Sequence, residues 1–250
     1  MKLAVSDLGF NGIESVADSL QQLGIEYIEI VPTKIKPYSA MRVDDIKMYR
    51  DILSDYNLKP YSFLSLFYGT DVKDISEVDK IIDHFKTLIE YAQAVDVKKL
   101  VFGSPVLRKK ITGWESHLQN IFVTLDSVLK DTGVSVIIEP VSANHGAEFW
   151  HTVKEVTEFI KSNKLKHIFT MIDTNNSLTE GEDPALVYLQ HQRLIKHIHI
   201  TEPGFGELEN LAFHMRFSNT IRNYPDVITH EITNKEVFHE SIKTFSQIYK

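Results

Sequence analysis

The stretch HIFTMIDTNNSLTEGEDPALVYLQHQRLIKHIHIT, residues 167–201, consists of two short apolar runs separated by a helical pattern. The runs HIFTMID (167–173) and IKHIHIT (195–201) are rich in the β-branched and aromatic residues that favour strands. The segment between them, residues 184–192, has the amphipathic pattern of a helix. A strand, a helix and a second strand in this order predict a βαβ unit of a parallel sheet.

The same alternation continues in both directions along the chain, which makes eight rounds in 250 residues. The other predicted strands are residues 2–8, 27–33, 60–67, 98–104, 134–140 and 226–233. The other helical patterns cover residues 14–24, 44–57, 78–95, 114–130, 152–162, 208–222 and 236–249. Eight βα rounds match the size of a closed barrel, and a doubly wound sheet is the alternative. We therefore predict an α/β protein with one (β/α)8 TIM-barrel domain covering residues 1–250.

The composition narrows the class of protein and its partners. Hydrophobic residues make up 43% and charged residues 24%, as in an ordinary globular protein, and the formal net charge is −7. An acidic chain is a poor partner for nucleic acid, whose phosphates attract basic surfaces. No apolar run has membrane-spanning length, and the first residues lack the features of a secretion signal. We expect a cytoplasmic protein without a membrane or nucleic-acid partner, and the sequence is compatible with a homo-oligomer.

Polar side chains end four consecutive predicted strands on the face that points into the barrel. Strand alternation places Glu139, Asp173, His199 and Glu231 at these positions. The carboxyl ends of barrel strands meet at the face where catalytic groups gather. Buried carboxylates need a cation or another charged partner, and the chain has no cysteine to supply a thiolate. Three carboxylates and one imidazole suit Mn²⁺, Mg²⁺ or Co²⁺, with Zn²⁺ as an alternative.

Simpler interpretations apply to each of these residues taken singly. A strand-end acid is often a helix cap or an ion-pair partner rather than a metal ligand. His197 lies one layer deeper than His199, and we expect it to be a hydrogen-bonded core histidine. His230 should face the outer helices and be structural. Pro203 and Gly204 end the strand directly after His199 and predict a turn at the barrel mouth.

The order and spacing of Glu139, Asp173, His199 and Glu231 resemble the single divalent-metal site of ketose 3-epimerases. These enzymes are a branch of the xylose isomerase-like barrels, a family of sugar and sugar-phosphate isomerases and epimerases that also includes apurinic endonucleases. The resemblance covers essentially the whole chain, including IEIVPTKIKP (28–37), LVFGSPVLRKK (100–110) and HITEPG (199–204). It implies a metal-dependent isomerase or epimerase of a sugar or sugar phosphate. Glu139 and Glu231 would be the catalytic pair that moves a proton through an enediolate.

The sequence departs from the epimerase pattern at three positions near the predicted site. Asn176 stands where the epimerases carry a substrate-binding histidine, His145 where they carry an acid, and Phe205 where an arginine is usual. The metal site therefore matches the pattern better than the substrate site does. Substrate contacts must come from other polar residues in the loops after the strands. Our candidates for these contacts are Lys34, Arg108, His145, Asn176 and Glu202.

Two other functions remain open on the same fold. A sugar-binding or regulatory protein without catalysis would explain why Asn176 and Phe205 replace reactive residues. An apurinic endonuclease-like phosphodiesterase would need more metal-binding histidines and a basic groove, neither of which the sequence offers. No GxGxxG, P-loop or GxSxG motif is present, so nucleotide binding and serine hydrolysis lack a motif.

Overall fold

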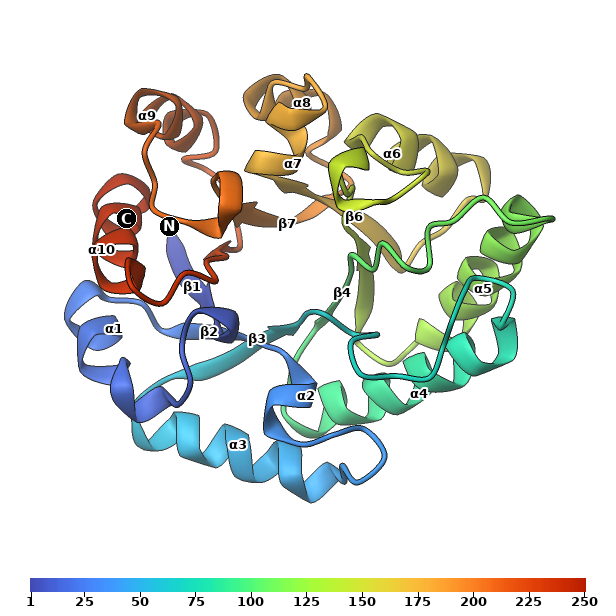
Figure 1. Ribbon diagram of the computed structural model, residues 1–250, viewed down its shortest axis with the longest axis horizontal. Helices are drawn as coiled ribbons and strands as arrows, with labels where there is room; N and C mark the ends of the chain where they lie inside the picture. The colour runs from blue at the N-terminus through green and yellow to red at the C-terminus, as the bar shows by residue number, and fades with distance from the viewer.

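The eight predicted apolar runs form eight parallel strands that close into a barrel in the order β1 to β8. The computed structural model describes residues 1–250. Pairing of β1 with both β2 and β8 closes the sheet, and the helices form a ring around it (Figure 1). The predicted (β/α)8 fold is confirmed, and the doubly wound alternative is excluded because such a sheet would have two open edges.

The strands are short, as is usual where all their faces are buried. They are β1 Lys2–Ser6, β2 Tyr27–Ile30, β3 Lys59–Phe63, β4 Lys99–Phe102, β5 Ser135–Ile138, β6 Ile168–Asp173, β7 Ile195–Ile200 and β8 Val227–His230. The helices are α1 Ala17–Leu23, α2 Pro32–Ile35, α3 Val43–Asp55, α4 Val78–Ala94, α5 Trp114–Leu129, α6 Val153–Ser162, α7 Thr174–Thr179, α8 Pro184–His191, α9 Leu211–Thr220 and α10 Phe238–Tyr249.

The largest hydrophobic core lies between the outer face of the barrel and the helices, and it contains 60 buried residues. Helix α4 shows how the sequence builds this core. Its buried side chains Ile81, Phe85, Leu88 and Ala92 recur every three or four residues and therefore share one face. On the barrel side, outward residues such as Phe102 pack against this face, with the Phe85 and Phe102 rings 6.1 Å apart.

A second, smaller apolar cluster fills the inside of the barrel. It consists of Val31, Leu64, Val101, Ile137 and Met171, each from a different strand or the residue that follows it. Strand alternation predicts Ile137 and Met171 directly beneath the strand-end acids of β5 and β6, and the structure confirms this arrangement. This apolar cluster lies directly beneath the polar groups of the barrel mouth.

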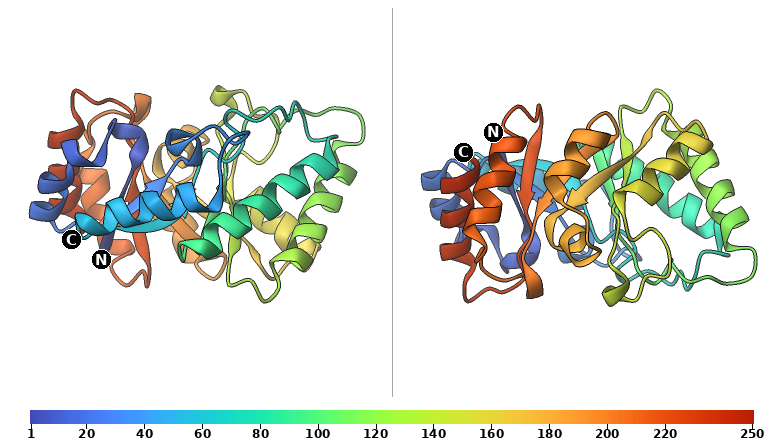
Figure 2. Two further views of the ribbon diagram at one scale, coloured as in Figure 1. Left: turned by 90° about the horizontal axis from the view of Figure 1, so that it is seen from below. Right: turned by 90° about the horizontal axis from the view of Figure 1, so that it is seen from above.

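The structure differs from the predicted elements mainly at their ends. β5 and β8 stop one residue before Glu139 and Glu231, so these two acids lie at the first position beyond their strands. Two short helices, α2 and α7, were not predicted, because each has fewer than two turns and no apolar periodicity to reveal it. The loops after β3, β4 and β5 lie together at one end of the barrel (Figure 2).

No helix of the protein combines the length and the apolar character that crossing a membrane requires.

Replacing Ile137 tests the interior cluster. Ile137→Ala leaves a cavity inside a barrel that the surrounding strands prevent from collapsing. We expect the free energy of unfolding to fall by roughly 2–5 kcal/mol, measured by urea denaturation. Val123→Ala is the matched control, because Val123 is 42% exposed on α5 and its truncation should change stability by less than about 0.5 kcal/mol. Equal stability of the two variants would contradict this account of the barrel interior.

Candidate metal centre at the barrel mouth

Four side chains converge at the carboxyl ends of β5 to β8. One potential ligand atom from each of Glu139, Asp173, His199 and Glu231 lies within 4.8 Å of all the others. Two atoms that bind one ion from opposite sides at roughly 2.0–2.4 Å lie at most about 4.8 Å apart. The spacing of the four groups is therefore compatible with a single divalent cation.

Asp173 is placed by the junction of a strand and a helix. It is the last residue of β6 and the N-cap of α7, where its Oδ1 accepts a hydrogen bond from the backbone N–H of Asn176 at 2.7 Å. Thr201 Oγ1 donates to the same oxygen at 2.8 Å. The other oxygen, Oδ2, is buried without any hydrogen-bond partner. A buried carboxylate oxygen without a partner is costly, and a bound cation would satisfy it.

His199 lies between two carboxylates. Its Nδ1 is 3.0 Å from Oε2 of Glu231, and its Nε2 is 2.8 Å from Oε2 of Glu29. Neither ring nitrogen has a well-aligned hydrogen bond. Burial would lower the pKa of His199, but the charges of Glu29 and Glu231 outweigh it and raise the pKa well above its usual value. Nδ1 therefore faces the acidic cluster, while Nε2 faces the interior of the barrel.

Glu29 is a residue of the candidate site that the sequence analysis missed. It is fully buried on β2, and its Oε1 accepts hydrogen bonds from Ser62 Oγ at 2.6 Å and from His197 Nε2 at 2.9 Å. Burial would raise the pKa of Glu29, but His199 and His197 lower it below the usual range. The available signal was one acid inside the apolar run YIEIV (27–31), because a buried carboxylate needs a partner.

The carboxylates of the cluster repel one another. Burial and the charge of Glu231 raise the pKa of Glu139 to about 8 and that of Asp173 to about 6. Each acid thus resists ionisation while its neighbours are charged, which a divalent cation would relieve. Together with the unpaired Oδ2 of Asp173, this crowding shows that the donor set fits a divalent ion.

A glycine makes room for the carboxylate of Glu139. A Cβ added to Gly103, directly after β4, would lie 1.8 Å from Oε2 of Glu139. Only glycine leaves this space at that position of the loop. On the other side, Nδ2 of Asn176 lies 3.4 Å from Oε1 of Glu139 as a weak hydrogen-bond donor.

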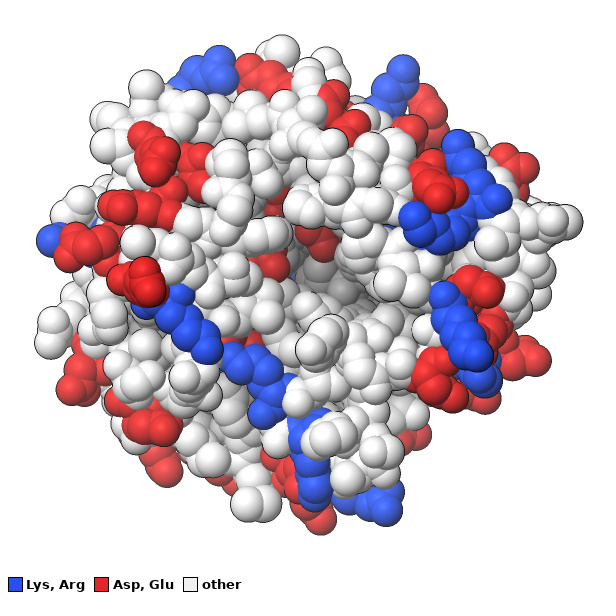
Figure 3. Space-filling model, in the orientation of Figure 1, with Lys and Arg blue, Asp and Glu red and all other residues white.

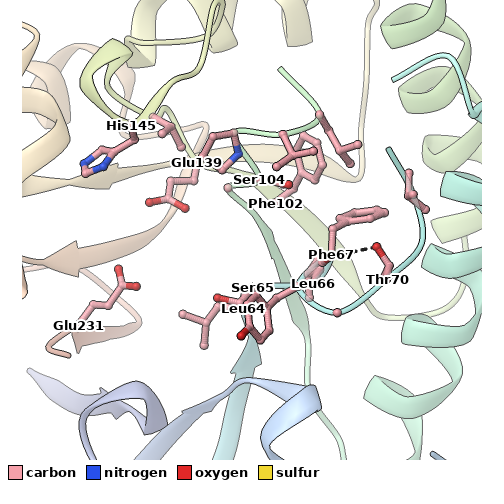
Figure 4. Close-up of a pocket in the computed structure, with 18 of the residues that line it drawn as sticks. Leu64, Ser65, Leu66, Phe67, Thr70, Phe102, Ser104, Glu139, His145 and Glu231 are labelled. Atoms are coloured by element: carbon pink, nitrogen blue, oxygen red, sulfur yellow. Dashed lines mark hydrogen bonds between the residues drawn. The ribbon is translucent and has the colours of Figure 1, made fainter. Parts of the chain in front are cut away.

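The cluster opens into a cavity of about 620 Å³. Glu139 and Glu231 line one part of it, and Leu66, Phe67 and Phe102 line the opposite part (Figure 4). From outside, the cavity is a central hollow with acidic atoms at its floor (Figure 3). The three residues at which the sequence departs from the epimerase pattern also line the cavity. They are His145, Asn176 and Phe205.

Arg108 does not face the cavity. It is fully buried, and its guanidinium donates hydrogen bonds to the backbone carbonyls of Phe102, Glu139 and Trp150 at 2.9, 2.6 and 3.2 Å. This environment corrects the expectation that Arg108 presents its charge to a substrate anion. The two Nη groups of the guanidinium bind these three carbonyls, while its Nε is buried without a partner. Arg108 thus ties the backbone of Glu139 to the loop after β4.

Lys34 and Glu202 also lie outside the cavity lining. Nζ of Lys34 donates to the backbone carbonyls of Asp7 and Phe10. Oε1 of Glu202 accepts a hydrogen bond from His214 Nε2 at 2.8 Å. The turn that the sequence predicts after Glu202 is present at Pro203–Phe205. Both predicted substrate contacts are therefore side chains with partners inside the protein.

The two histidines outside the cluster have the environments predicted for them. His197 is fully buried and hydrogen-bonded to Glu29. His230 points outward: its Nδ1 donates to the carbonyl of Ile200 at 2.8 Å, and its Nε2 lies 2.7 Å from Ser241 Oγ on α10. Burial lowers the pKa of both imidazoles to about 4, so both are neutral structural groups.

Removing the charge of Glu29 tests whether it orients His199. A carboxylate behind a ligating histidine fixes the ring and raises its basicity, so we expect Glu29→Gln to weaken Mn²⁺ binding by roughly 10- to 100-fold. Isothermal titration of the metal-free protein measures this. Glu26→Gln, an exposed change at the start of the same strand, should leave the affinity unchanged. Unaltered Mn²⁺ affinity in a folded Glu29→Gln protein would remove Glu29 from the metal centre.

Gly103→Ala tests the space beside Glu139. The new methyl group would displace the flexible carboxylate rather than the backbone, so we expect the fold to survive and Mn²⁺ affinity to fall by about tenfold or more. Circular dichroism and metal titration separate the two effects. Gly206→Ala is the control, because a Cβ there would have no neighbour closer than 3.9 Å. The same Mn²⁺ affinity in both variants would show that Gly103 is not needed for the site.

Known proteins share this architecture. No curated protein matches the sequence at a significant level. Among solved structures, the 3-keto-D-glucoside 4-epimerase YcjR of E. coli has a TM-score of 0.77 and 16% identity over 99% of both chains. A family 2 AP endonuclease of Brucella melitensis has a TM-score of 0.78 and 17% identity, again over 99% of both chains. The IOLI protein, whose crystal structure contains a zinc atom, has a TM-score of 0.73 and 18% identity over 100% of this chain and 98% of its own.

These identities are too low to show more than a shared fold. A family model is more specific: the model described as xylose isomerase-like TIM barrel matches residues 3–247, nearly the whole sequence. The chain therefore belongs to the xylose isomerase-like TIM barrel family.

Proposed function

We propose that this protein is a divalent-metal-dependent isomerase or epimerase that moves a proton at the carbon next to the carbonyl of a keto sugar. One observation carries the proposal. The carboxylates of Glu139 and Glu231 come from β5 and β8 and point into the same cavity from two sides, with Asp173 and His199 beside them (Figure 4). Two carboxylates facing one space can act on both faces of a substrate held between them.

The metal would be held by Glu139, Asp173, Glu231 and Nδ1 of His199. When bound, a divalent ion supplies positive charge that polarises the ketone and stabilises the enediolate. The three oxygen donors favour Mn²⁺, Mg²⁺ or Co²⁺, while the zinc atom in the similar IOLI structure supports Zn²⁺ as an alternative.

Glu139 and Glu231 transfer protons, and neighbouring side chains hold Glu139 in position. One of the two glutamates, Glu139 or Glu231, takes the proton from the substrate carbon, and the other, already protonated from solvent, delivers its own proton to the opposite face, which inverts the carbon. After the product leaves, proton exchange with solvent restores the starting protonation of both. Asn176 holds the carboxylate of Glu139 from one side, and Arg108 holds its backbone carbonyl.

The same geometry supports a phosphodiesterase or a non-catalytic sugar-binding protein less well. A phosphodiesterase acting on nucleic acid needs cationic side chains around its substrate, and no Lys or Arg lines the cavity. A sugar-binding protein without catalysis would not need a buried carboxylate oxygen with no hydrogen-bond partner, as in Asp173. The convergence of the four donors therefore favours an enzyme.

Exchange of a carbon-bound proton with solvent tests the mechanism. We incubate the Mn²⁺-loaded protein with ketoses, ketose phosphates and keto-inositols in D₂O and follow deuterium uptake by NMR. The wild type should incorporate one deuterium next to the carbonyl, and Glu139→Gln or Glu231→Gln should lower turnover by about 10² to 10⁴. Metal occupancy is measured in each variant, so that loss of a base is separated from loss of the ion.

The exposed change Glu240→Gln on α10 is the control and should keep full turnover. Chelation should stop exchange, and Mn²⁺ should restore it. Turnover without solvent deuterium, with full activity in both cavity variants, would refute proton transfer and favour a hydride shift. A protein that binds these sugars equally well with and without metal, and never turns them over, would be the non-catalytic binder.

A further inference from the structure

We propose that the outer half of the cavity binds a second, neutral sugar ring linked to the keto sugar, so that the substrate is an uncharged glycoside rather than a sugar phosphate. The inference rests on the proposed function, because it takes the acidic cluster as the place of the reacting carbons. It concerns the part of the cavity that the proton transfer itself does not use.

The cavity is larger than one sugar ring requires. Its volume of about 620 Å³ equals that of about twenty water molecules at roughly 30 Å³ each. It extends from Glu139 and Glu231 to the loops after β3 and β4, which supply Leu64–Thr70 and Gly103–Leu107 to its lining. A single ring held at the carboxylates would leave the part beside these two loops filled with water.

The outer wall is apolar and held rigidly in place. The ring of Phe67 packs against those of His84, Phe85 and Phe102, with centroids 5.0, 5.5 and 5.8 Å away. Nε2 of His84 donates to the backbone carbonyl of Leu66 at 2.7 Å, which ties the loop after β3 to α4. These contacts preorganise the wall, which lowers the entropic cost of binding the C–H face of a ring.

An exposed aromatic side chain stands at the edge of this wall. Tyr68 lines the cavity, yet 74% of it is exposed to solvent, and Val106 on the facing loop is 57% exposed. The turn that carries Tyr68 is closed by a hydrogen bond from its N–H to the carbonyl of Ser65 at 3.0 Å, and Thr70 Oγ1 donates to Phe67 O at 2.9 Å (Figure 4). Tyrosine offers an apolar face together with a polar tip, which suits a ring that is polar at its edge.

The charge of the cavity excludes a phosphate. No Lys or Arg lines it, and the three carboxylates of the cluster keep a net charge of about −1 after one divalent ion binds. A phosphate ester carries a charge of about −1.5 to −2, so the negative charge of the cluster would repel it. The nearby cation Lys109 is paired with Glu148 at 3.2 Å.

Phe205 adds an apolar side chain to the lining of the cavity. The centroid of its ring lies 6.1 Å from that of the His145 ring. The resemblance to epimerases leads us to expect an arginine at this position. Its carbonyl accepts a hydrogen bond from the N–H of Thr233 at 3.1 Å, which fixes the turn that carries it. The cavity thus presents an apolar ring where an anion-binding group would stand.

Three ligands that share one ketose test the inference. D-Fructose, D-fructose 6-phosphate and isomaltulose carry a hydroxyl, a phosphate and a glucosyl group at the same oxygen. We titrate each into the Mn²⁺-loaded protein. Isomaltulose should bind about tenfold more tightly than fructose, since burying roughly 60 Å² of apolar surface suffices for that factor. Fructose 6-phosphate should bind more weakly than fructose.

Substitutions then locate the second ring. Tyr68→Ala should reduce the ratio of isomaltulose to fructose affinity severalfold, whereas Leu186→Ala, a comparably exposed apolar change on α8, should leave that ratio unchanged. Tighter binding of fructose 6-phosphate than of isomaltulose overturns the inference, and so does equal binding of isomaltulose and fructose. These affinity ratios do not depend on turnover. Failure of the deuterium experiment with an intact ratio would refute the proposed chemistry but keep the second-ring site.

Discussion

The contact between His199 and Glu29 is the constraint on which the rest of the site depends. The two residues lie on β7 and β2, which are not neighbours in the barrel, so their side chains meet across its interior at 2.8 Å. Glu29 is in turn hydrogen-bonded to His197 and Ser62. The imidazole of His199 is thereby turned so that Nδ1 faces the mouth. A buried carboxylate without such partners would be strongly destabilising. Closing the barrel therefore requires the pairing of Glu29 with the histidines, and the same pairing orients Nδ1 of His199.

The loop after β4 positions a group that belongs to another strand. Gly103 leaves the space in which the carboxylate of Glu139 lies, and Arg108 binds the backbone carbonyl of the same residue. Glu139 lies one residue beyond β5, where its N–H still donates to the carbonyl of Phe102 on β4 at 3.1 Å. Arg108 adds a hydrogen bond to the carbonyl of Glu139, and Gly103 leaves the space for its side chain. Arg108 acts by holding Glu139 and touches neither the cavity nor a metal ligand atom.

The sequence was sufficient for the fold and for the residues whose position follows from alternation along one strand. Glu139, Asp173, His199 and Glu231 could be predicted in this way, because period two decides which side chains enter the barrel. Glu29 was missed, although the acid inside YIEIV was visible, because its histidine partners are about 170 positions away and only the closed barrel brings them near. The role of Arg108 was missed for a different reason. A sequence shows that an arginine is charged but not that folding buries it among carbonyl groups.

The acidic cluster and the apolar wall of the cavity come from different parts of the barrel. The acidic cluster stands at the ends of β5 to β8, while the apolar wall comes from the loops after β3 and β4 on the other side of the cavity. Changes in the loop after β3 can alter what fits beside the cluster without moving its four donors, whereas Gly103 and Arg108 in the loop after β4 also hold Glu139. The ring of Phe67 in the loop after β3 packs on His84 and Phe85 of α4, so the core of the fold sets the conformation of this side of the cavity.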